Sequence, residues 1–532
     1  MKNGYMASLP AMAINNLKSC KRRCKVADTT MSLNAKEVVI RATVLRNLLL
    51  RRQDRLGERV GVLLPPSVAA ATTNLSLTVA GRITVNLNYA LGSDFVNRCV
   101  EIARLGTIVT SRRFLSKTKL DVNCRELIYL EDLKREASRF DRLRTACRVY
   151  LSSTQSLMRY LGIDQFNPCK PATILFTSGS TGEPKGVVLT HANIGHNLAE
   201  IKRVGKLEDK DVLLGVLPFF HSFGFTASLW ATLTQDITGV FHFHPLEASV
   251  IGKLAECYKA TIFHSTPTFL RQYLKRIKPH QFADVNFVLS GGEPLPNQLA
   301  DEFETKFGIR PMDSYGATEC APLISLNVPT SRSEHSSSGI DRLEGSVGKP
   351  ARNVDIRILD VENESPCPVG KSGVIHVRGP NVMLGYFERD DLTRKVLKDG
   401  WYDTGDIGHV DSDGFLFVTG RLSRFSKIGG EMIPHVAIET VLSEYTNETN
   451  DDQIRIGVTS VRNIVGEENI VVLYNTHLRS VDAMIFHLAQ CGFPNSFIPK
   501  PKNFFLVDKI PTLPTGKLDL QMLKTIASEK VV

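Results

Sequence analysis

The sequence has few features of a disulfide-stabilised or zinc-binding protein. Its ten cysteines are scattered singly over 532 residues, and only Cys20 and Cys24 lie close together. That pair has neither the spacing nor the accompanying histidines of a zinc site. Reduced thiols in a cytosolic protein are the simplest explanation, and we therefore expect a cytoplasmic location.

The sequence also lacks an uninterrupted hydrophobic run of the kind that spans a membrane. The uncharged stretch Val212–Thr234 is long enough, but Pro218, His221 and Gly224 interrupt it. It predicts a strand, a loop and a helix in a buried core. The weak apolar patch near the N-terminus contains Pro10 and makes a poor signal peptide.

No nucleic-acid-binding motif is recognisable, although the net charge is +10 and the isoelectric point is about 9.0. The excess of basic side chains favours an acidic partner: a nucleotide, coenzyme A, an acidic carrier protein or an anionic membrane. Residues 1–25 end in a cluster of Lys18, Lys21, Arg22, Arg23 and Lys25. We expect a solvated, partly disordered tail there, and the alternative is an electrostatic contact with a lipid surface or an acidic protein.

Apolar runs and helical periodicity alternate along the first part of the chain. A helix is predicted over 35–52, followed by strands at 60–64, 83–87 and 107–110, with a helix over 68–80. Alternating strands and helices predict a parallel, doubly wound sheet. Residues 131–165 are charged and amphipathic, which indicates a surface excursion.

The stretch Thr173–Ile194, TILFTSGSTGEPKGVVLTHANI, holds a loop of small residues and hydroxyls between two predicted strands. Its glycines let the backbone turn tightly, so that successive N–H groups converge on an anion. Hydroxyls add donors and Lys185 adds a positive charge. It is not a Walker A loop, because Lys185 is followed by Gly186 and a strand rather than by a helix. Thr190, or one of the residues after it, can cap a helix that begins near Asn193.

This loop resembles the signature of the adenylate-forming superfamily, which includes acyl-CoA synthetases, acyl-acyl carrier protein synthetases, luciferases and peptide-synthetase adenylation domains. In that family the loop holds the phosphates of ATP while a carboxylate is activated. The resemblance implies that Lys185 acts in catalysis and that the loop binds ATP through Thr177, Ser178, Gly179, Ser180, Thr181 and Gly182.

Two later segments resemble the adenine-binding motifs of the family. Phe287–Pro294 reads as a strand entering a glycine turn, which implies adenine contacts from Gly291, Gly292 and Glu293. In Asp313-Ser314-Tyr315-Gly316-Ala317-Thr318-Glu319, the resemblance implies three roles. Asp313 would bind the adenine amino group, Tyr315 would stack on the ring, and Glu319 would hold Mg²⁺ together with Thr181. Carboxylates and hydroxyls are the ligands that a phosphate-bound Mg²⁺ prefers.

The strand-rich part from Ser346 onward shows period-two alternation and predicts a small β-barrel. Trp401–Asp406 follows, and Asp406 matches the family carboxylate that accepts both ribose hydroxyls. Arg421 matches the arginine near the ribose. The family usually has Lys-Asp shortly afterwards, and the second of these residues is a hinge. Here Ser423 and Arg424 stand in those positions, so the chain departs from the family at the hinge carboxylate and Arg424 is the expected hinge.

The segment Phe219–Gly224 matches a second family motif, in which a His or aromatic side chain walls the carboxylate end of the acid pocket. His221 is the candidate, although a histidine between aromatic residues is often a core or loop residue. Two interpretations remain open for four nearby apolar residues, an acyl tunnel or the core: Phe223, Phe225, Leu229 and Trp230.

Near the C-terminus, Pro514-Thr515-Gly516-Lys517 matches the context of the family's adenylation lysine, so Lys517 is a candidate catalytic residue. The segment Arg424–Ile433 most resembles the ligase half of the bifunctional enzyme that also reacylates lysophospholipid. The acyltransferase half should carry a His-x₄-Asp motif upstream of the ligase half. The only such spacing is His477–Asp482, which lies in the expected C-terminal domain, so we interpret this match as a coincidence. The chain therefore reads as at most the ligase half.

We thus expect an α/β fold in three segments: a basic tail (1–30), a large AMP-binding domain of doubly wound sheets plus a small β-barrel (31–420), and a smaller α+β domain (421–532). The expected reaction activates a long-chain fatty acid with ATP and Mg²⁺ and transfers it to a pantetheine thiol. The expected acceptor is acyl carrier protein or coenzyme A. Peripheral contact with a membrane is left open, and no nucleic-acid partner is expected. A non-catalytic nucleotide or acyl binder on the same fold is the rival reading.

Overall fold

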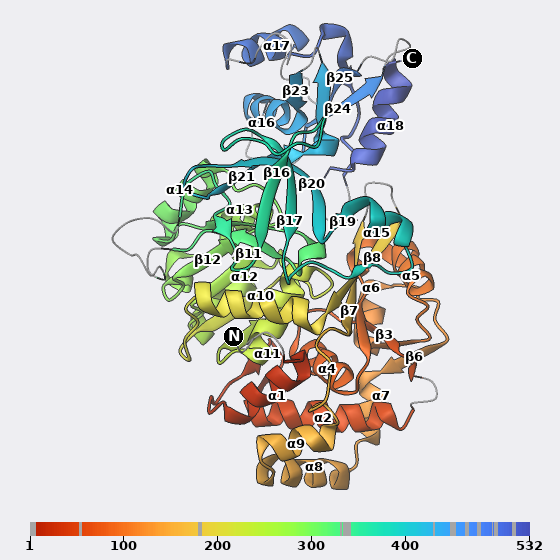
Figure 1. Ribbon diagram of the computed structural model, residues 1–532. Coiled ribbons are helices and arrows are strands. Elements are labelled where there is room, and N and C mark those ends of the chain that lie inside the picture. Colours follow the sequence, from red (N-terminus) through yellow and green to blue (C-terminus); the bar gives the residue numbers. More distant parts are fainter. Residues whose placement is uncertain are drawn as a thin grey trace.

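The computed structural model describes residues 7–52, 56–178, 183–329, 332, 342–428, 431–446, 454–462, 468–475, 480–491, 493, 498–512 and 518–531. The fold is α/β, with a large N-terminal part built on three sheets and a smaller C-terminal part (Figure 1). The expected fold class is confirmed. The C-terminal part lies at one end of the molecule, and helices α8 (Arg139–Leu151) and α9 (Thr154–Leu161) lie at the other (Figure 1).

The first sheet has seven strands in the order β18-β8-β7-β4-β3-β5-β6. Its strands are β3 (Arg59–Leu63), β4 (Ile83–Asn86), β5 (Thr107–Thr110), β6 (Glu126–Tyr129), β7 (Pro171–Ser178), β8 (Pro184–Thr190) and β18 (Gly385–Tyr386). The central pairs are parallel, whereas β8 runs antiparallel to both β7 and β18. Helix α2 (Ala35–Leu50) precedes β3, and α4 (Val68–Val79), α5 (Gly92–Ile102) and α6 (Arg112–Thr118) connect the strands that follow. The predicted alternation of strand and helix is confirmed.

The second sheet has nine strands in the order β15-β14-β13-β12-β11-β9-β10-β1-β2. They are β1 (Val26–Ala27), β2 (Ser32–Leu33), β9 (Val212–Gly215), β10 (Thr238–Phe241), β11 (Ile262–Ser265), β12 (Phe287–Ser290), β13 (Met312–Gly316), β14 (Leu323–Leu326) and β15 (Lys349–Pro350). Its helices are α10 (His191–Val204), α11 (Ala231–Thr234), α12 (Ala248–Tyr258), α13 (Pro267–Arg276) and α14 (Asn297–Phe307). α10 starts where expected, because the Thr190 side chain accepts a hydrogen bond from the Asn193 N–H.

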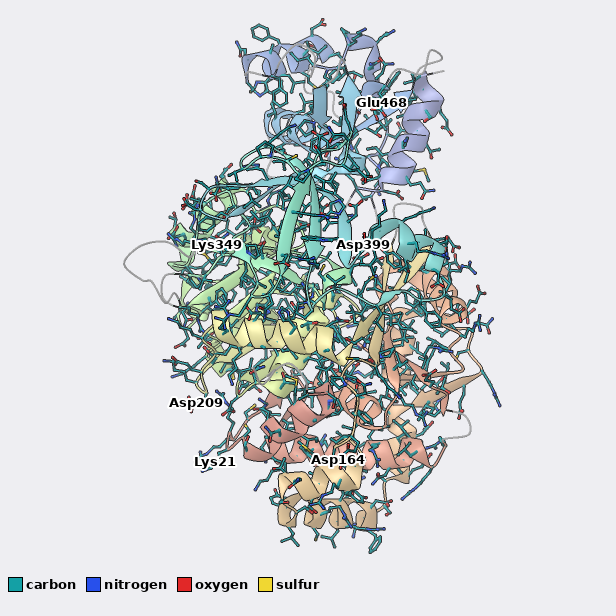
Figure 2. All side chains as sticks on the ribbon, viewed as in Figure 1. Lys21, Asp164, Asp209, Lys349, Asp399 and Glu468 are labelled. Atoms are coloured by element: carbon teal, nitrogen blue, oxygen red, sulfur yellow. The ribbon has the colours of Figure 1, made fainter. Side chains whose placement is uncertain are left out.

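The N-terminal segment is folded, and the prediction of a solvated tail is wrong for residues 7–25. Helix α1 (Leu9–Ser19) buries Leu9, Ala13, Ile14 and Leu17 in the main core. Lys25 is fully buried, and its ammonium group donates to the carbonyl oxygens of Gln235 and Ile237 at 2.5 and 2.7 Å. The sequence did not reveal this burial, because the hydrogen-bond partners of Lys18, Arg22 and Lys25 lie 131 to 216 positions away in the chain. Lys21 does face solvent (Figure 2).

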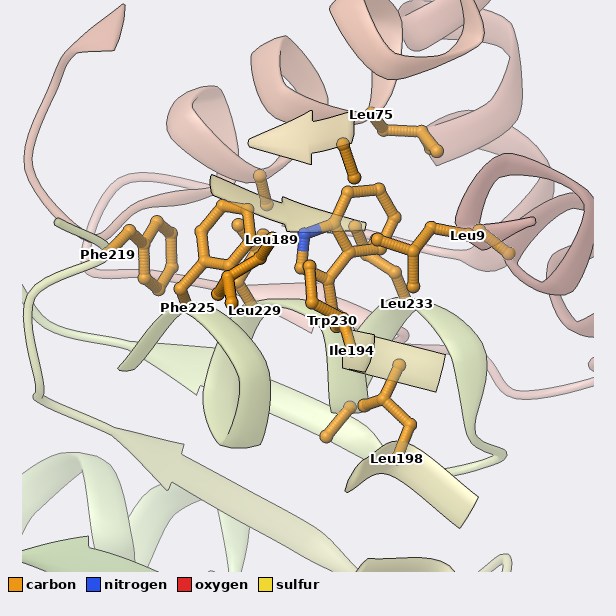
Figure 3. Packing of buried hydrophobic residues seen from close by; sticks show 14 of the residues in the cluster. Leu9, Leu75, Leu189, Ile194, Leu198, Phe219, Phe225, Leu229, Trp230 and Leu233 are labelled. Atoms are coloured by element: carbon orange, nitrogen blue, oxygen red, sulfur yellow. The ribbon is translucent and has the colours of Figure 1, made fainter. Parts of the chain in front are cut away.

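The uncharged stretch after β9 folds as predicted, as a strand, a loop and helical turns. The π-helix η2 (Gly224–Trp230) leads directly into α11. Figure 3 shows Phe225, Leu229 and Trp230 packed among Leu9, Leu189 and Ile194. Within the part of the chain that the structure describes, no helix has the length and apolarity needed to cross a membrane.

The third sheet is antiparallel, has five strands and lies in the region where the sequence predicts a small β-barrel. Its strands are β16 (Asp355–Leu359), β17 (Gly373–Arg378), β19 (Leu397–Lys398), β20 (Trp401–Val410) and β21 (Leu416–Arg421), and α15 (Asp390–Val396) precedes β19. The long strand β20 pairs with β17, β19 and β21. This sheet carries the last residues of the large part.

The C-terminal part is an α+β unit with its own two apolar clusters. Its elements are β22 (Phe425–Ile428), β23 (Glu431–Pro434), α16 (His435–Thr446), β24 (Ile456–Arg462), β25 (Glu468–Tyr474), α17 (Val481–Gln490), β26 (Phe504–Leu506) and α18 (Leu520–Val531).

Candidate active site

The hairpin β7–β8 carries the phosphate loop predicted from the sequence. Its register pairs Thr177 with Lys185 across the two strands. Gly186 lies against β7, where a Cβ atom would approach Ile174 Cγ2 to 2.9 Å, so close packing of the strands requires a glycine there. The backbone of Ser178 ends β7, and Gly179, Ser180, Thr181 and Gly182 lie outside the described residues.

Glu319 lies on the short helix η4 (Thr318–Cys320), which contacts strand β8. Its Oε1 accepts a hydrogen bond of 2.8 Å from the hydroxyl of Tyr386 on β18. The ammonium group of Lys185 lies 5.7 Å from the centroid of the same tyrosine ring, within the range of a cation–π contact. Because β18 pairs with β8, one tyrosine connects the predicted magnesium ligand with the predicted phosphate-binding lysine.

Asp406 is held between two donors from different strands. Its Oδ2 accepts from the Tyr315 hydroxyl at 2.5 Å, and its Oδ1 accepts from Arg421 Nε at 2.8 Å. Arg421 is the cross-strand partner of Asp406 in the β20–β21 register, so the antiparallel ladder itself places the two charges together. Each carboxylate oxygen has two lone pairs, so Asp406 keeps one acceptor position on each oxygen. That is the bidentate acceptor that a pair of neighbouring hydroxyls needs.

A chain of tyrosines links these two carboxylates. Tyr402 on β20 is buried, and it contributes to the electrostatic environment of Tyr386. Burial is the main cause that raises the pKa of Tyr315, Tyr386 and Tyr402 far above the usual value, so all three stay protonated donors. Tyr386 and Tyr402 were not predicted as site residues from the sequence. No spacing rule marks them, although Tyr402 lies inside the Trp401–Asp406 motif.

The predicted adenine-binding residues meet at the ends of β12 and β13. The Ser314 hydroxyl donates to the Ser290 carbonyl oxygen at 2.7 Å, and a Cβ atom on Gly291 would lie 2.9 Å from that hydroxyl. Gly292 has a φ of +81°, which favours glycine. Asp313 accepts from the N–H groups of Leu295 and Ser314, yet burial outweighs them and raises its pKa to about 7.

Glu293 has a structural contact as well as its predicted role. Its Oε2 accepts from the Thr268 hydroxyl at 2.7 Å and from the Thr268 N–H at 3.3 Å, in the first turn of α13. A carboxylate in that position satisfies a free N–H group at the helix start. Contact with adenine therefore remains a prediction for Glu293.

The motif around Glu319 is fixed by close backbone contacts. A Cβ atom on Gly316 would lie 2.5 Å from the Pro322 carbonyl oxygen, so only glycine fits there. The Thr318 hydroxyl lies 3.3 Å from that of Ser222. This contact ties the Phe219–Gly224 segment to η4, and His221 in that segment is exposed beside Phe220.

The structure separates the four apolar residues whose role the sequence left open. Phe225, Leu229 and Trp230 are fully buried in the core, whereas Phe223 points toward Gly291 and stacks on His264 with ring centroids 5.4 Å apart. His264 is buried, and burial lowers its pKa to about 4, so its ring is neutral. Phe223 is thus the apolar side chain that lies next to the predicted adenine loop.

The passage to the C-terminal part is short. Arg421 is bound to Asp406 on β20, whereas the buried Arg424 pairs with Glu439 on α16 and donates to the Val458 carbonyl oxygen at 3.1 Å. Only Leu422 and Ser423 separate the two arginines. Lys517 lies outside the described residues.

The donor set suits a magnesium ion that is held mainly by phosphates. Among the described residues, no group of three His, Cys, Asp or Glu side chains could hold a metal ion by itself. Mg²⁺ in nucleotide sites typically takes one or two protein ligands and completes its shell with phosphates and water. Glu319 fits such a site, because only its Oε1 is engaged by Tyr386.

Comparison with known proteins places the chain among AMP-binding enzymes. The family model described as "AMP-binding enzyme" matches residues 15–387. Oxalate–CoA ligase of Arabidopsis thaliana is 30% identical over 376 residues, which cover 68% of this chain and 69% of that protein. Long-chain-fatty-acid–CoA ligase of Salmonella typhimurium is 28% identical over 365 residues, which cover 68% of this chain but only 62% of that protein.

A solved structure supports the fold. The o-succinylbenzoate coenzyme A synthetase of Bacillus subtilis, in complex with ATP and a magnesium ion, superposes with a TM-score of 0.79 at 24% identity. The match covers 96% of this chain and 98% of that one, so the likeness extends into the C-terminal part.

Proposed function

The chain belongs to the AMP-binding enzyme family and is an AMP-forming acid–thiol ligase, and we propose that it activates a long-chain fatty acid with ATP. The carboxylate attacks the α-phosphorus, the bond to the bridging oxygen breaks, and pyrophosphate leaves. A pantetheine thiol then attacks the acyl-adenylate and displaces AMP. No protein nucleophile is required, so catalysis consists of positioning and charge neutralisation.

The observation that carries the proposal is the carboxylate of Asp406 between Tyr315 and Arg421. We assign to it the two ribose hydroxyls, which would use the remaining lone pair on each oxygen. Tyr315 would stack on the adenine with its ring while its hydroxyl stays on Asp406. Asp313 and the Gly291–Gly292 turn would contact the adenine edge.

The phosphate side of the site rests on Glu319 and Lys185. Mg²⁺, held by Glu319 together with Thr181, would neutralise charge on the phosphates as pyrophosphate departs. Lys185 and the hydroxyls of the loop from Thr177 to Gly182 would add positive charge and donors. Lys517 would bridge the attacking carboxylate and the α-phosphate, and His221 would wall the carboxylate end of the acid pocket.

The acceptor thiol is the finer part of the proposal. The resemblance of Arg424–Ile433 to acyl-acyl carrier protein synthetases favours a carrier protein. The relatives' names favour coenzyme A as a second candidate, since both relatives named above are CoA ligases. In either case the C-terminal part would turn about Arg424 between the two half-reactions.

The first experiment is ATP–pyrophosphate exchange with a panel of fatty acids. Exchange should require the acid, and Lys517→Ala should reduce it sharply. Lys509→Ala, an exposed lysine eight positions earlier, serves as the matched control and should exchange normally. Persisting exchange in Lys517→Ala would reject the role of that lysine. Absence of exchange with every acid would favour the non-catalytic binder.

The second experiment decides the acceptor. The enzyme is offered carrier protein and coenzyme A in parallel, and thioester formation is followed with each. Product with the carrier protein alone supports the carrier assignment. Product with coenzyme A alone would instead assign coenzyme A as the acceptor, in agreement with the names of the relatives.

A further inference from the structure

Helix α8 (Arg139–Leu151) presents its more apolar face to solvent. Phe140, Leu143, Tyr150 and Leu151 are 69, 65, 53 and 84% exposed. Their spacing of three, four or seven places them with Cys147 on one helical face. The opposite face, which packs on the protein, carries the buried Thr145 and Val149. A surface helix of a globular protein normally has the reverse arrangement.

The exposed apolar side chains are concentrated at this end of the molecule. Among the described residues sixteen large hydrophobic side chains are exposed, and five of them lie between residues 140 and 160. The fifth is Tyr160 on helix α9 (Thr154–Leu161). Scattered exposed apolar residues need no explanation, but a contiguous group marks an interaction surface.

This apolar stripe is bordered by an excess of positive charge, although Arg135 lies 3.9 Å from Asp132 just before the segment. Residues 134–160 contain seven cationic side chains against two acidic ones, a net charge of +5 in a chain whose total is +10. Both acids are already paired with arginines outside the segment: Asp141 with Arg51 at 2.6 Å, and Glu136 with Arg52. Among the described residues, no acidic side chain lies within ion-pair distance of Arg139 or Arg144.

Two tyrosines at the border lie under cations. Lys36 Nζ is 4.7 Å from the ring centroid of Tyr150, and the Arg148 guanidinium is 3.9 Å from that of Tyr160. Tyrosine and basic side chains together are typical of residues that occupy the headgroup level of a bilayer. Apolar side chains in the centre, tyrosines at the edge and cations around them match the polarity gradient of a lipid surface.

We propose that α8 docks the protein on an anionic lipid membrane. Phe140, Leu143 and Leu151 enter the boundary between headgroups and acyl chains, while Arg139, Arg144 and Arg148 contact the anionic headgroups. We assign membrane contact to this surface and not to the N-terminal basic cluster, because Lys18 and Lys25 of that cluster donate hydrogen bonds to carbonyl oxygens within the protein.

The geometry favours lipid over an acidic carrier protein. Helices α8 and α9 lie at the end of the molecule opposite α16, α17 and α18 (Figure 1). A carrier docked on α8 would therefore lie far from Asp406 and the C-terminal part, where the thiol must arrive. A membrane on α8 leaves that part free. The surface would also bring the enzyme to a fatty acid dissolved in the bilayer. This consequence rests on the proposed function, but the docking of α8 on a membrane does not depend on it.

The test is cosedimentation of the full chain with vesicles of phosphatidylcholine alone or mixed with phosphatidylglycerol. The wild type should bind only the anionic vesicles, and high salt should weaken binding. Arg139→Gln and Arg144→Gln should each lower the partition coefficient about fivefold. The pair Phe140→Ser and Leu151→Ser should lower it by at least about tenfold, because burial of both side chains is lost.

Matched controls change similar residues elsewhere: Val369→Ser, which is also strongly exposed, Arg276→Gln on α13, and Arg23→Gln in the N-terminal cluster. They should bind like the wild type. All substituted side chains are exposed, so the thermal unfolding midpoint should not move, and this is measured for each variant. Absence of wild-type binding to anionic vesicles would overturn the proposal. An equal loss of vesicle binding in the control variants would also overturn it. The same holds if the protein binds no vesicles but binds an acidic carrier protein, and the α8 variants lose that binding.

Discussion

Tyr386 donates its hydroxyl to Glu319 across 2.8 Å, although the two residues are 67 positions apart in the chain. The same ring lies under the ammonium group of Lys185. The predicted magnesium ligand and the predicted phosphate-binding lysine are thus oriented by one side chain that carries no motif of its own. The arrangement explains how β18, a strand of two residues, contributes to the site.

Tyr386→Phe should lower ATP–pyrophosphate exchange about tenfold, since a hydrogen bond to a charged acceptor contributes roughly 1.5 kcal/mol. The Mg²⁺ concentration needed for half-maximal exchange should rise, because Glu319 is less well oriented. A magnesium titration of the exchange rate measures both effects. Tyr160→Phe, which removes an exposed hydroxyl, is the control. An unchanged magnesium dependence would mean that Tyr386 only supports packing.

Asp406→Asn should weaken AMP binding about 100-fold, because two hydrogen bonds from the ribose hydroxyls to a charged acceptor, each worth roughly 1.5 kcal/mol, are lost. Arg421→Gln should weaken it by no more than about fivefold, because the arginine is mostly exposed and its ion pair is screened by solvent. Titration calorimetry with AMP measures both. Asp399→Asn, in an exposed turn before β20, should bind normally. Equal losses in the first two variants would contradict the ribose assignment.

Asp313 should make adenine binding depend on pH near neutrality. Burial raises its pKa to about 7, so the free protein holds a proton there at lower pH. Only the ionised form is purely an acceptor for the adenine amino group, so affinity should rise as pH rises through 7. Adenosine is the suitable ligand, because it has no phosphate that titrates in this range. Asp313→Asn should remove the pH dependence.

The same shift has a defined effect on stability. A folded pKa of about 7 against an unfolded value near 3.9 means that the folded state binds more protons between these pH values. The free energy of unfolding therefore falls as pH rises through this window, and the loss is complete above pH 7. Urea unfolding of the wild type and of Asp313→Asn between pH 4 and 8 should show a smaller fall in the variant. Parallel curves would contradict the raised pKa.

Arg424→Met should destabilise the C-terminal part by about 3–5 kcal/mol, because it leaves Glu439 buried without its cation. Burial already raises the pKa of Glu439, and the guanidinium opposes that shift. Without it the folded pKa rises further, so the loss should grow as pH rises. Amide hydrogen exchange on β24 is the measurement, since Val458 bonds to both residues. Arg424→Met combined with Glu439→Leu should recover most of the loss.

Several features of the fold were predictable because they depend on neighbours in the sequence. The strands flanking the phosphate loop, the helix after Thr190 and the strands at 83–86 and 107–110 follow from short apolar runs and local capping. The glycine at position 316 was marked by a motif, and the structure adds the reason, a carbonyl oxygen of Pro322 in the space of a side chain.

Other features were not predictable, because their partners are distant in the chain. Lys25 looked like a solvated cation, yet its acceptors lie 210 and 212 positions away. Phe223 and Phe225 are alike in type and near in sequence, but one packs beside Gly291 and the other belongs to the core. The amphipathic character of residues 139–151 was visible, but which face points outward depends on what the helix packs against.

The sequence by itself determined the family, the order of the candidate motifs and the local elements that carry them. Those properties rest on residue type, spacing and hydrogen bonds between near neighbours. Tertiary structure alone decided that Tyr386 joins Glu319 to Lys185, that Asp406 retains a free lone pair on each oxygen, and that the apolar face of α8 meets solvent. Each of these depends on strand register and packing between segments that only the folded chain brings together.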